Sequence, residues 1–357
     1  MGASMRWAGW FLLGAMACGG GRAGGGNADA GAGGTGGPPP PVDAGVPDAG
    51  PSADCQGVMP APPASAFTFD VATNSPGEVC DLATTDGQGI VAAKGGATQW
   101  SEFSDVGTRN GSFQSADPHL IPQTSGFVGL SGSGTLAVAG WDAFGNNWPV
   151  FAAGGTAGMV ALSPAQGDGA IVYSADSAGL QIRRLDATLA EAASLTVAGT
   201  FTPRGGAQDA GGAVLALVGA GPAISGIWVD LAKGTAGAPF PVGSATGALA
   251  RPLPGGGVAV RLDGHWSALL QPGDPALHAA PSWLRDGADF ATVRAGKAYA
   301  LLPAAGGLVD LVSPQGNLCG TVPFPGVTRV SVGADGSVVG SSGPSGCTKV
   351  FWRDALR

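Results

Sequence analysis

A glycine-rich tight turn that leads at once into a short apolar run recurs along most of the chain and limits the possible folds. The Gly that closes this turn occurs at seven positions: Gly89, Gly134, Gly169, Gly212, Gly257, Gly296 and Gly336. Successive closing glycines lie 45, 35, 43, 45, 39 and 40 residues apart. Gly accepts positive φ at no steric cost, and runs such as Val258-Ala259-Val260 are too short for helices. Each copy therefore predicts a tight turn followed by a buried strand.

A period near 40 residues, with one hairpin in each copy, is typical of a β-propeller blade. We therefore predict an all-β chain that folds as a β-propeller with seven blades of about 40 residues, six or eight being the alternatives. The interval of 35 residues between Gly134 and Gly169 is tight for four strands. One interpretation is that the blade at this interval lacks its outer strand.

The two ends of the predicted propeller each supply part of one blade. An alternating strand, Phe67 to Val71, precedes the first repeat, and the last repeat, which ends with Thr348 to Trp352, is one strand short. If the first strand completes the last blade, the ring is closed by N- and C-terminal strands and no bare edge remains. Helical composition occurs only at 187–193, where we expect a short cap on a loop.

A second regularity follows the turns. An aromatic or aliphatic residue recurs nine to sixteen residues after each closing Gly, at Trp100, Trp148, Ile182, Trp228, Trp266, Val309 and Trp352. This pattern resembles WD-type propellers, in which a Trp of the third strand fills the wedge between blades, although the WD dipeptide is absent. The resemblance implies that these side chains belong to the core.

The N-terminus predicts export. One positive charge at Arg6 precedes an apolar run, Trp7 to Ala17, which is too short to span a bilayer but suits the core of a signal peptide. Residues 1–17 are therefore predicted to be a signal peptide. No later apolar stretch reaches the length of a membrane span.

The sequence Ala15-Met16-Ala17-Cys18 resembles the lipobox of bacterial lipoproteins. The resemblance implies that Cys18 becomes the first residue of the mature protein and carries lipid. Leu is usual where Ala15 stands, so cleavage after Ala17 by an ordinary signal peptidase is the alternative. Gly19 in place of Asp implies an outer-membrane lipoprotein, on the periplasmic side or at the cell surface; without the lipid the protein is secreted.

Residues 18–63 comprise the lipidated Cys and a linker that is rich in Gly, Ala and Pro and lacks side chains that could form a core. We predict a disordered tether with a root-mean-square reach of about 35 to 40 Å. The propeller domain is predicted to occupy residues 64–357.

Four cysteines remain after Cys18, at Cys55, Cys80, Cys319 and Cys347. An even number in an exported chain predicts disulfides, with three possible connectivities. Pairing within the N-terminal pair and within the C-terminal pair closes short loops and is favoured, so we expect Cys319 to bond Cys347. A bond from Cys55 or Cys80 to the C-terminal pair is the alternative, since a propeller brings its two ends together.

The sequence offers no sign of catalysis. Hydrolase G-x-S-x-G, P-loop and H-E-x-x-H patterns are absent, and no C-x-x-C occurs, so we predict no catalytic residue, no metal site and no cofactor. The formal net charge is −8 and no basic cluster exceeds Arg183-Arg184, which excludes nucleic acid as a partner.

Two loops are rich in groups that could recognise a partner, and both are expected between second and third strands on one face of the propeller. Their candidate binding residues are Trp141, Asp142, Phe144 and Asn147 in one loop, and Asp263 and His265 in the other. Aromatic rings beside amides and carboxylates suit stacking on sugars or anchoring of a protein hot spot. In the alternative interpretation, Trp141 only covers the end of its strand.

Together these features predict an exported, lipid-anchored β-propeller, monomeric, that acts as a binding or scaffold module at the cell envelope. Its partners would be the membrane, through the N-terminal lipid, and an unidentified envelope protein or glycan. In architecture alone it resembles the propeller lipoprotein of the outer-membrane barrel-assembly machinery. The alternative is an exported polysaccharide-active enzyme, a lyase or glycosidase, which the sequence disfavours because its acidic residues lie mostly in turns.

Overall fold

In a computed structural model of the protein, the chain divides into two compact units, Met1–Asp48 and Ala49–Arg357. The structure describes Cys55 and residues 67–70, 83–85, 91–95, 99–104, 109–115, 120–132, 134–142, 144–156, 158–253, 256–285, 291–292, 298–304, 308–313, 315–323, 327–332, 337–342 and 348–352. The predicted signal peptide, the lipidation site Cys18, most of the linker, Cys80 and Cys347 lie outside these residues and stay predictions.

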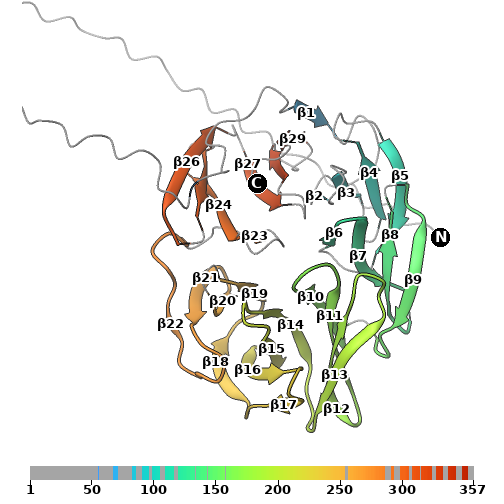
Figure 1. Ribbon diagram of the computed structural model, residues 1–357, viewed down its shortest axis with the longest axis vertical. Coiled ribbons are helices and arrows are strands. Elements are labelled where there is room, and N and C mark those ends of the chain that lie inside the picture. Colours follow the sequence, from blue (N-terminus) through green and yellow to red (C-terminus); the bar gives the residue numbers. More distant parts are fainter. Residues whose placement is uncertain are drawn as a thin grey trace, which may run out of the picture. The chain divides into compact units, whose positions relative to one another are not determined.

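The second unit consists of short antiparallel strands, as the repeated turns predict (Figure 1). The first three sheets contain β2 (Ala83–Thr85), β3 (Val91–Gly95), β4 (Gln99–Phe103) and β5 (Arg109–Gln114); β6 (Ile121–Gln123), β7 (Gly126–Ser131), β8 (Ala137–Trp141) and β9 (Asn147–Ala152); and β10 (Val160–Pro164), β11 (Ala170–Asp176), β12 (Gly179–Leu185) and β13 (Glu191–Val197). In each of these sheets the strands are neighbours in chain order.

The next three sheets repeat this plan. They contain β14 (Pro203–Gln208), β15 (Val214–Ala220), β16 (Ala223–Asp230), β17 (Thr235–Ala236) and β18 (Phe240–Ser244); β19 (Ala248–Pro252), β20 (Val258–Leu262), β21 (His265–Leu269) and β22 (His278–Ala279); and β23 (Ala291–Thr292), β24 (Ala298–Ala304), β25 (Leu308–Val312) and β26 (Leu318–Pro323). The β14–β18 sheet has a divided outer strand, because β17 and β18 both pair with β16.

The last sheet joins the two ends of the unit. It contains β27 (Val327–Val332), β28 (Val338–Ser342) and β29 (Thr348–Trp352), and its outer strand is β1 (Phe67–Asp70). The register runs from Phe67 opposite Phe351 to Asp70 opposite Thr348. The pairing expected from the alternating pattern of Phe67 to Val71 is therefore present.

First strands of successive sheets lie side by side: β10 against β14, β14 against β19, and both β2 and β23 against β27. Figure 1 shows these strands towards the middle of the unit and outer strands such as β9, β13 and β26 at its periphery. This is the arrangement of a β-propeller, so the predicted all-β propeller fold is confirmed. The described residues form seven sheets, while seven as the blade count of the whole ring, and the closure of that ring, stay predictions.

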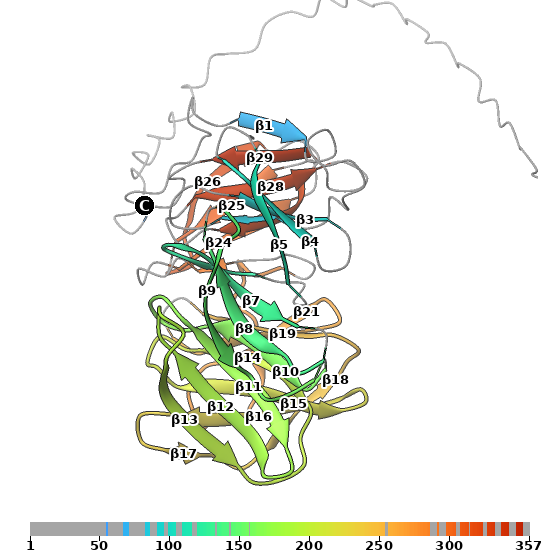
Figure 2. The same cartoon turned by 90° about the vertical axis from the view of Figure 1, so that its right-hand side faces the viewer.

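The β10–β13 and β14–β18 sheets are buried on both faces because a neighbouring sheet packs on each face. In β11, all residues from Ala170 to Ala175 are buried, and in β15 the buried run is Val214 to Val218. One core cluster joins Tyr173 and Ile182 to residues of β15 and β16, and Figure 2 shows these strands as neighbouring layers. Two-sided burial explains why the sequence shows continuous apolar runs here rather than alternation.

The tight interval after Gly134 results from a change of phase in the turn pattern. Gly134 lies between β7 and β8, whereas Gly169, Gly212 and Gly257 each lie between the first and second strands of their sheets. The equivalent turn of the β6–β9 sheet, between β6 and β7, is closed by Gly126, which has φ 146°, and not by Gly134. This sheet has four strands, so the interpretation that its outer strand is missing is wrong.

The expected helical cap at 187–193 is also wrong. The described residues there form a turn and then β13, which begins at Glu191 and pairs along β12. Ala and Glu favour helices only weakly, and the backbone hydrogen bonds offered by the outer edge of β12 outweigh that preference.

The disulfide pairing differs from the favoured prediction. Cys319 bonds to Cys55, at a sequence separation of 264 residues, and not to Cys347. The favoured argument considered only loop length, whereas the fold places Cys55, which precedes β1, beside Cys319 in β26. The alternative, a bond between the N-terminal and C-terminal cysteines, is the one present.

Candidate functional site

Trp141, the leading candidate for partner binding, lies inside the protein. It is the last residue of β8, only 2% of its surface is exposed, and its ring stacks on Phe113 at a centroid distance of 4.6 Å. Both rings belong to a core cluster with Trp100 and Phe127, between the β2–β5 and β6–β9 sheets. The prediction that Trp141 contacts a partner is therefore wrong, and its ring is part of the core.

The register shows why Trp141 is buried. Trp141 pairs with Phe127 in β7, and both rings face the preceding β2–β5 sheet. Trp228 in β16 packs against the following β19–β22 sheet, so the two Trp residues do not occupy the same position. The sequence pattern placed Trp148 in a third strand. Trp148 instead lies in the outer strand β9, packed over Gly140, where a Cβ would come within 2.2 Å of its ring.

The turn between β8 and β9 is held by the carboxylate of Asp142. Its Oδ1 accepts hydrogen bonds from the backbone N–H groups of Phe144 and Asn146, both at 2.9 Å, and its Oδ2 accepts one from the Asn146 side chain at 3.0 Å. Partial burial, the largest single influence, raises the pKa of Asp142, but these hydrogen bonds together outweigh it and the pKa is lowered. Asp142 is therefore occupied in shaping the turn.

This turn presents Phe144 to solvent. The side chain is 69% exposed, the highest value among the exposed large hydrophobic side chains of the described residues, and Asn147 beside it is also exposed. The backbone beneath Phe144 rests on β5, since a Cβ on Gly111 would lie 2.5 Å from the Phe144 carbonyl oxygen. A rigid turn with an exposed aromatic ring is suited to anchoring a partner, because little conformational entropy is lost on binding.

The same turn geometry recurs elsewhere, with a side-chain oxygen as its support. At Asp186, Asp209 and Ser313 the side-chain oxygen accepts a hydrogen bond from the N–H four residues later. Positive φ occurs three residues after each of them, at Leu189, Gly212 and Gly316. The Asp142 turn, with positive φ at Gly145, is one member of this set.

Asp residues at these third-to-fourth strand connections show a repeat that the sequence reasoning missed. Asp142, Asp186, Asp230 and Asp274 are each 44 residues apart and lie at or after the ends of the third strands. Asp142 and Asp186 directly follow the last residue of their third strands, and Asp230 is the last residue of its strand, whereas Asp274 lies five residues beyond the end of β21. The spacing of the first three indicates where β8 ends.

The second candidate loop, the turn between β20 and β21, is also built around an Asp. Asp263 has φ 46° and accepts hydrogen bonds from the backbone N–H groups of Thr246 and Gly247. The hydrogen bond from Gly247, followed by the one from the Thr246 hydroxyl, lowers the pKa of the Asp263 carboxyl. His265 is exposed at the start of β21.

The two candidate loops do not share a face, contrary to the prediction. The first turns of neighbouring sheets are joined by hydrogen bonds, Thr124 to Asp168 and Gln166 to Asp209, and the third-to-fourth connections lie at this same end of each antiparallel sheet. Near the same end, the indole N–H of Trp228 donates a hydrogen bond to the backbone carbonyl of Asp274, in the next sheet. The Asp142 turn lies at this end, whereas the turn of Asp263, between second and third strands, lies at the opposite end.

Glycosidase chemistry needs a carboxylic acid of raised pKa. The pKa is lowered at Asp142, Asp186, Asp230, Asp263 and Asp274. Burial raises the pKa of Asp209, but its carboxylate holds the turn before β15. Within the described part of the chain, no three His, Cys, Asp or Glu side chains gather as a metal site.

No described helix has the length and apolar character needed to cross a membrane. No protein-family model matches the chain, and no curated protein is detectably similar to it.

The chain is similar in fold to several solved propeller structures. BamB from Moraxella catarrhalis is 15% identical, with a TM-score of 0.43 over 77% of this chain and 82% of that one. A streptogramin B lyase is 11% identical, with a TM-score of 0.48 over 80% and 97% of the two chains. The WD40 domain of Pan2 from Neurospora crassa is 11% identical, with a TM-score of 0.47 over 80% and 95%. At these values the similarity carries no argument about function.

Proposed function

We propose that the protein is an exported, lipid-anchored β-propeller that acts as a binding or scaffold module at the cell envelope. The observation that carries the proposal is the bond between Cys55 and Cys319, because disulfides persist in oxidising compartments outside the cytoplasm. The apolar run before Cys18 and the Gly- and Pro-rich segment after it support export, lipidation and a flexible tether.

The anchored protein is a monomer in the outer membrane, on its periplasmic side or at the cell surface. Its partner is an envelope protein or glycan. The Asp142 turn supplies the contact, with Phe144 as the anchor and Asn147 as an adjacent hydrogen-bonding group.

Lipidation is tested on the intact protein. We expect the mature chain to begin at Cys18 with a diacylglycerol thioether and an acylated amine, so its intact mass exceeds that of the peptide from residue 18. Replacing Cys18 by Ser should leave the signal uncleaved or release the protein from membranes. An unmodified chain beginning at Cys18, or a different first residue, would contradict the proposal.

The binding turn is tested by two matched truncations of exposed apolar side chains. Phe144→Ala should leave the melting temperature within about 1 °C, because the side chain is 69% exposed, and should weaken partner capture about tenfold or more. Val150→Ala, at a residue of β9 that is 56% exposed, is the control and should keep capture intact. Capture can be followed by photocrosslinking from each position in whole envelopes, and equal capture by both variants would place the contact elsewhere.

A further inference from the structure

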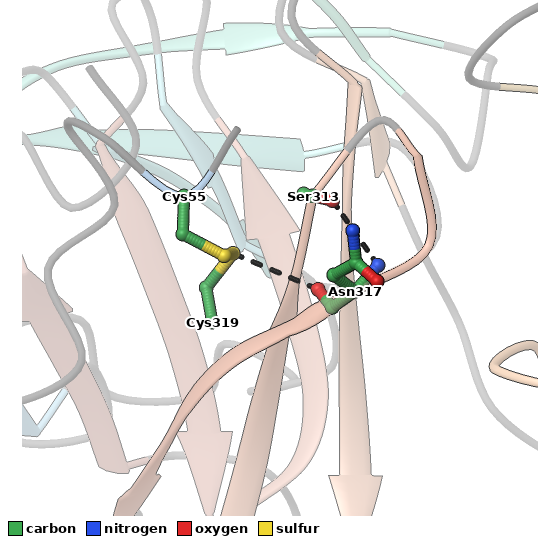
Figure 3. The surroundings of a disulfide bond; sticks show 4 residues. All are labelled: Cys55, Ser313, Asn317 and Cys319. Atoms are coloured by element: carbon green, nitrogen blue, oxygen red, sulfur yellow. Dashed lines mark hydrogen bonds between the residues drawn. A yellow bond between two sulfur atoms is a disulfide. The ribbon is translucent and has the colours of Figure 1, made fainter. Parts of the chain in front are cut away.

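The disulfide joins β26 to Cys55, a described residue that precedes the first strand, β1. Cys55 precedes β1 by eleven intervening residues, 56–66, and is only 6% exposed against the outer strand β26. Figure 3 shows the bond beside the turn that carries Ser313 and Asn317, and the Asn317 carbonyl oxygen lies 3.6 Å from Sγ of Cys319. That same oxygen accepts the Ser313 N–H at 2.9 Å, so the bond rests on an ordered turn.

The other attachment of this segment is weak by comparison. The strand β1 has four residues, and its described pairing is with the outer edge of β29 alone. Beyond Asp70 the chain passes through residues 71–82 before β2 begins. An outer strand of four residues with long connections on both sides gains little stability from its own hydrogen bonds.

We propose that the Cys55–Cys319 bond is a redox-operated clasp that keeps β1 paired with β29. While the bond is closed, the chain is tied covalently on both sides of β1, to β26 through Cys55 and to β2 along the backbone, with residues 56–82 between the two ties, so undocked β1 has limited freedom and rebinds readily. When the bond is open, β1 is held on one side only, and the undocked state gains the entropy of a free tail. The chain-entropy relation for a loop of this length predicts an increase in undocking of about 100-fold or more.

Opening requires a dithiol reductant. One thiolate of the dithiol attacks a sulfur of the disulfide, giving a mixed disulfide and releasing the other cysteine as a thiol. The second thiol of the reductant then attacks the mixed disulfide. Cys55 and Cys319 each end as thiols, and the reductant leaves as a disulfide, having supplied two electrons and two protons. The product has a free N-terminal segment and an uncovered edge on β29.

The experiment compares hydrogen exchange in the oxidised and dithiothreitol-reduced full-length protein. We expect backbone amides of β1 and β29 to exchange about 100-fold faster after reduction, while amides of the buried strand β15 keep their protection. The double variant Cys55→Ser with Cys319→Ser should show the same fast exchange without reductant. The matched control, Cys80→Ser with Cys347→Ser, should exchange slowly until it is reduced.

Two outcomes would overturn the clasp. Equal protection of β29 in the oxidised protein, the reduced protein and the Cys55→Ser, Cys319→Ser variant would show that the bond does not hold β1. Equal acceleration in β15 and β29 would show that it stabilises the whole domain instead. Either result leaves export and lipidation at Cys18 untouched, since the intact-mass measurement tests those separately.

Discussion

Replacing Trp141 by Ala should lower the free energy of unfolding by about 3 to 5 kcal/mol. The indole is almost fully buried and stacks on Phe113, so its loss leaves a cavity between the β2–β5 and β6–β9 sheets. Backbone on both sides of that cavity is fixed in sheets, which limits collapse around it. Urea denaturation followed by fluorescence of the remaining Trp residues would measure the change.

The control for this substitution is Phe144→Ala, three residues away on the same turn but exposed. It should change the free energy of unfolding by less than about 0.5 kcal/mol. If both variants unfold at the same denaturant concentration, the burial of Trp141 and its assignment to the core are wrong.

Replacing Gly206 by Ala should destabilise the protein by about 3 kcal/mol. A Cβ at this position in β14 would lie 2.2 Å from the carbonyl oxygen of Leu215 and 2.6 Å from the hydroxyl of Tyr173. The first contact is with backbone, so β14 and β15 must separate. The second displaces a buried hydroxyl that hydrogen-bonds to Ser163 at 2.9 Å.

The matched change is Gly134→Ala, where an added Cβ meets nothing within 4 Å. Its midpoint of thermal unfolding should stay within about 1 °C of the parent protein, whereas Gly206→Ala should fall by several degrees. A Gly206→Ala variant as stable as Gly134→Ala would show that β14 has room for a Cβ beside β15 and Tyr173.

The sequence predicts the fold well because the turn chemistry is local. A Gly after Asp needs only its own φ to start a hairpin, and the period of these hairpins reflects the size of one sheet. Which pair of strands a turn joins, however, is not decided by the turn's own residues. The turns at Gly134 and Gly169 look alike in sequence but join different pairs of strands, and only Gly169 has a positive φ.

The binding site was predicted less well, because exposure depends on neighbouring sheets. Trp141 and Phe144 are three residues apart in the sequence, and the residues around them do not indicate which ring is buried. The answer comes from Phe113 on another sheet, which stacks on Trp141, and from β5, which supports the turn and directs Phe144 outward. The spacing of 44 residues between Asp142 and Asp186 would have marked where β8 ends.

The disulfide could not be predicted from loop length, because its partner is chosen by the path of the chain around the propeller. Cys319 and Cys347 are close in sequence, yet Cys319 lies in the outer strand β26 and bonds to a residue that precedes all the described strands. Cysteines bond when the fold brings their Cα atoms close together, and closeness in sequence does not ensure this.

The position of that bond also determines how mechanical load enters the protein. A pull on the chain ahead of Cys55 divides at that residue between the disulfide and the eleven residues that lead to β1. The disulfide is the more direct of the two covalent routes, so we expect tension to pass first to β26, which is paired along β25. The four residue pairs between β1 and β29 are then spared. A propeller dragged by its tether would be held by a strand in the interior of the chain, and its end-to-end pairing would carry no force.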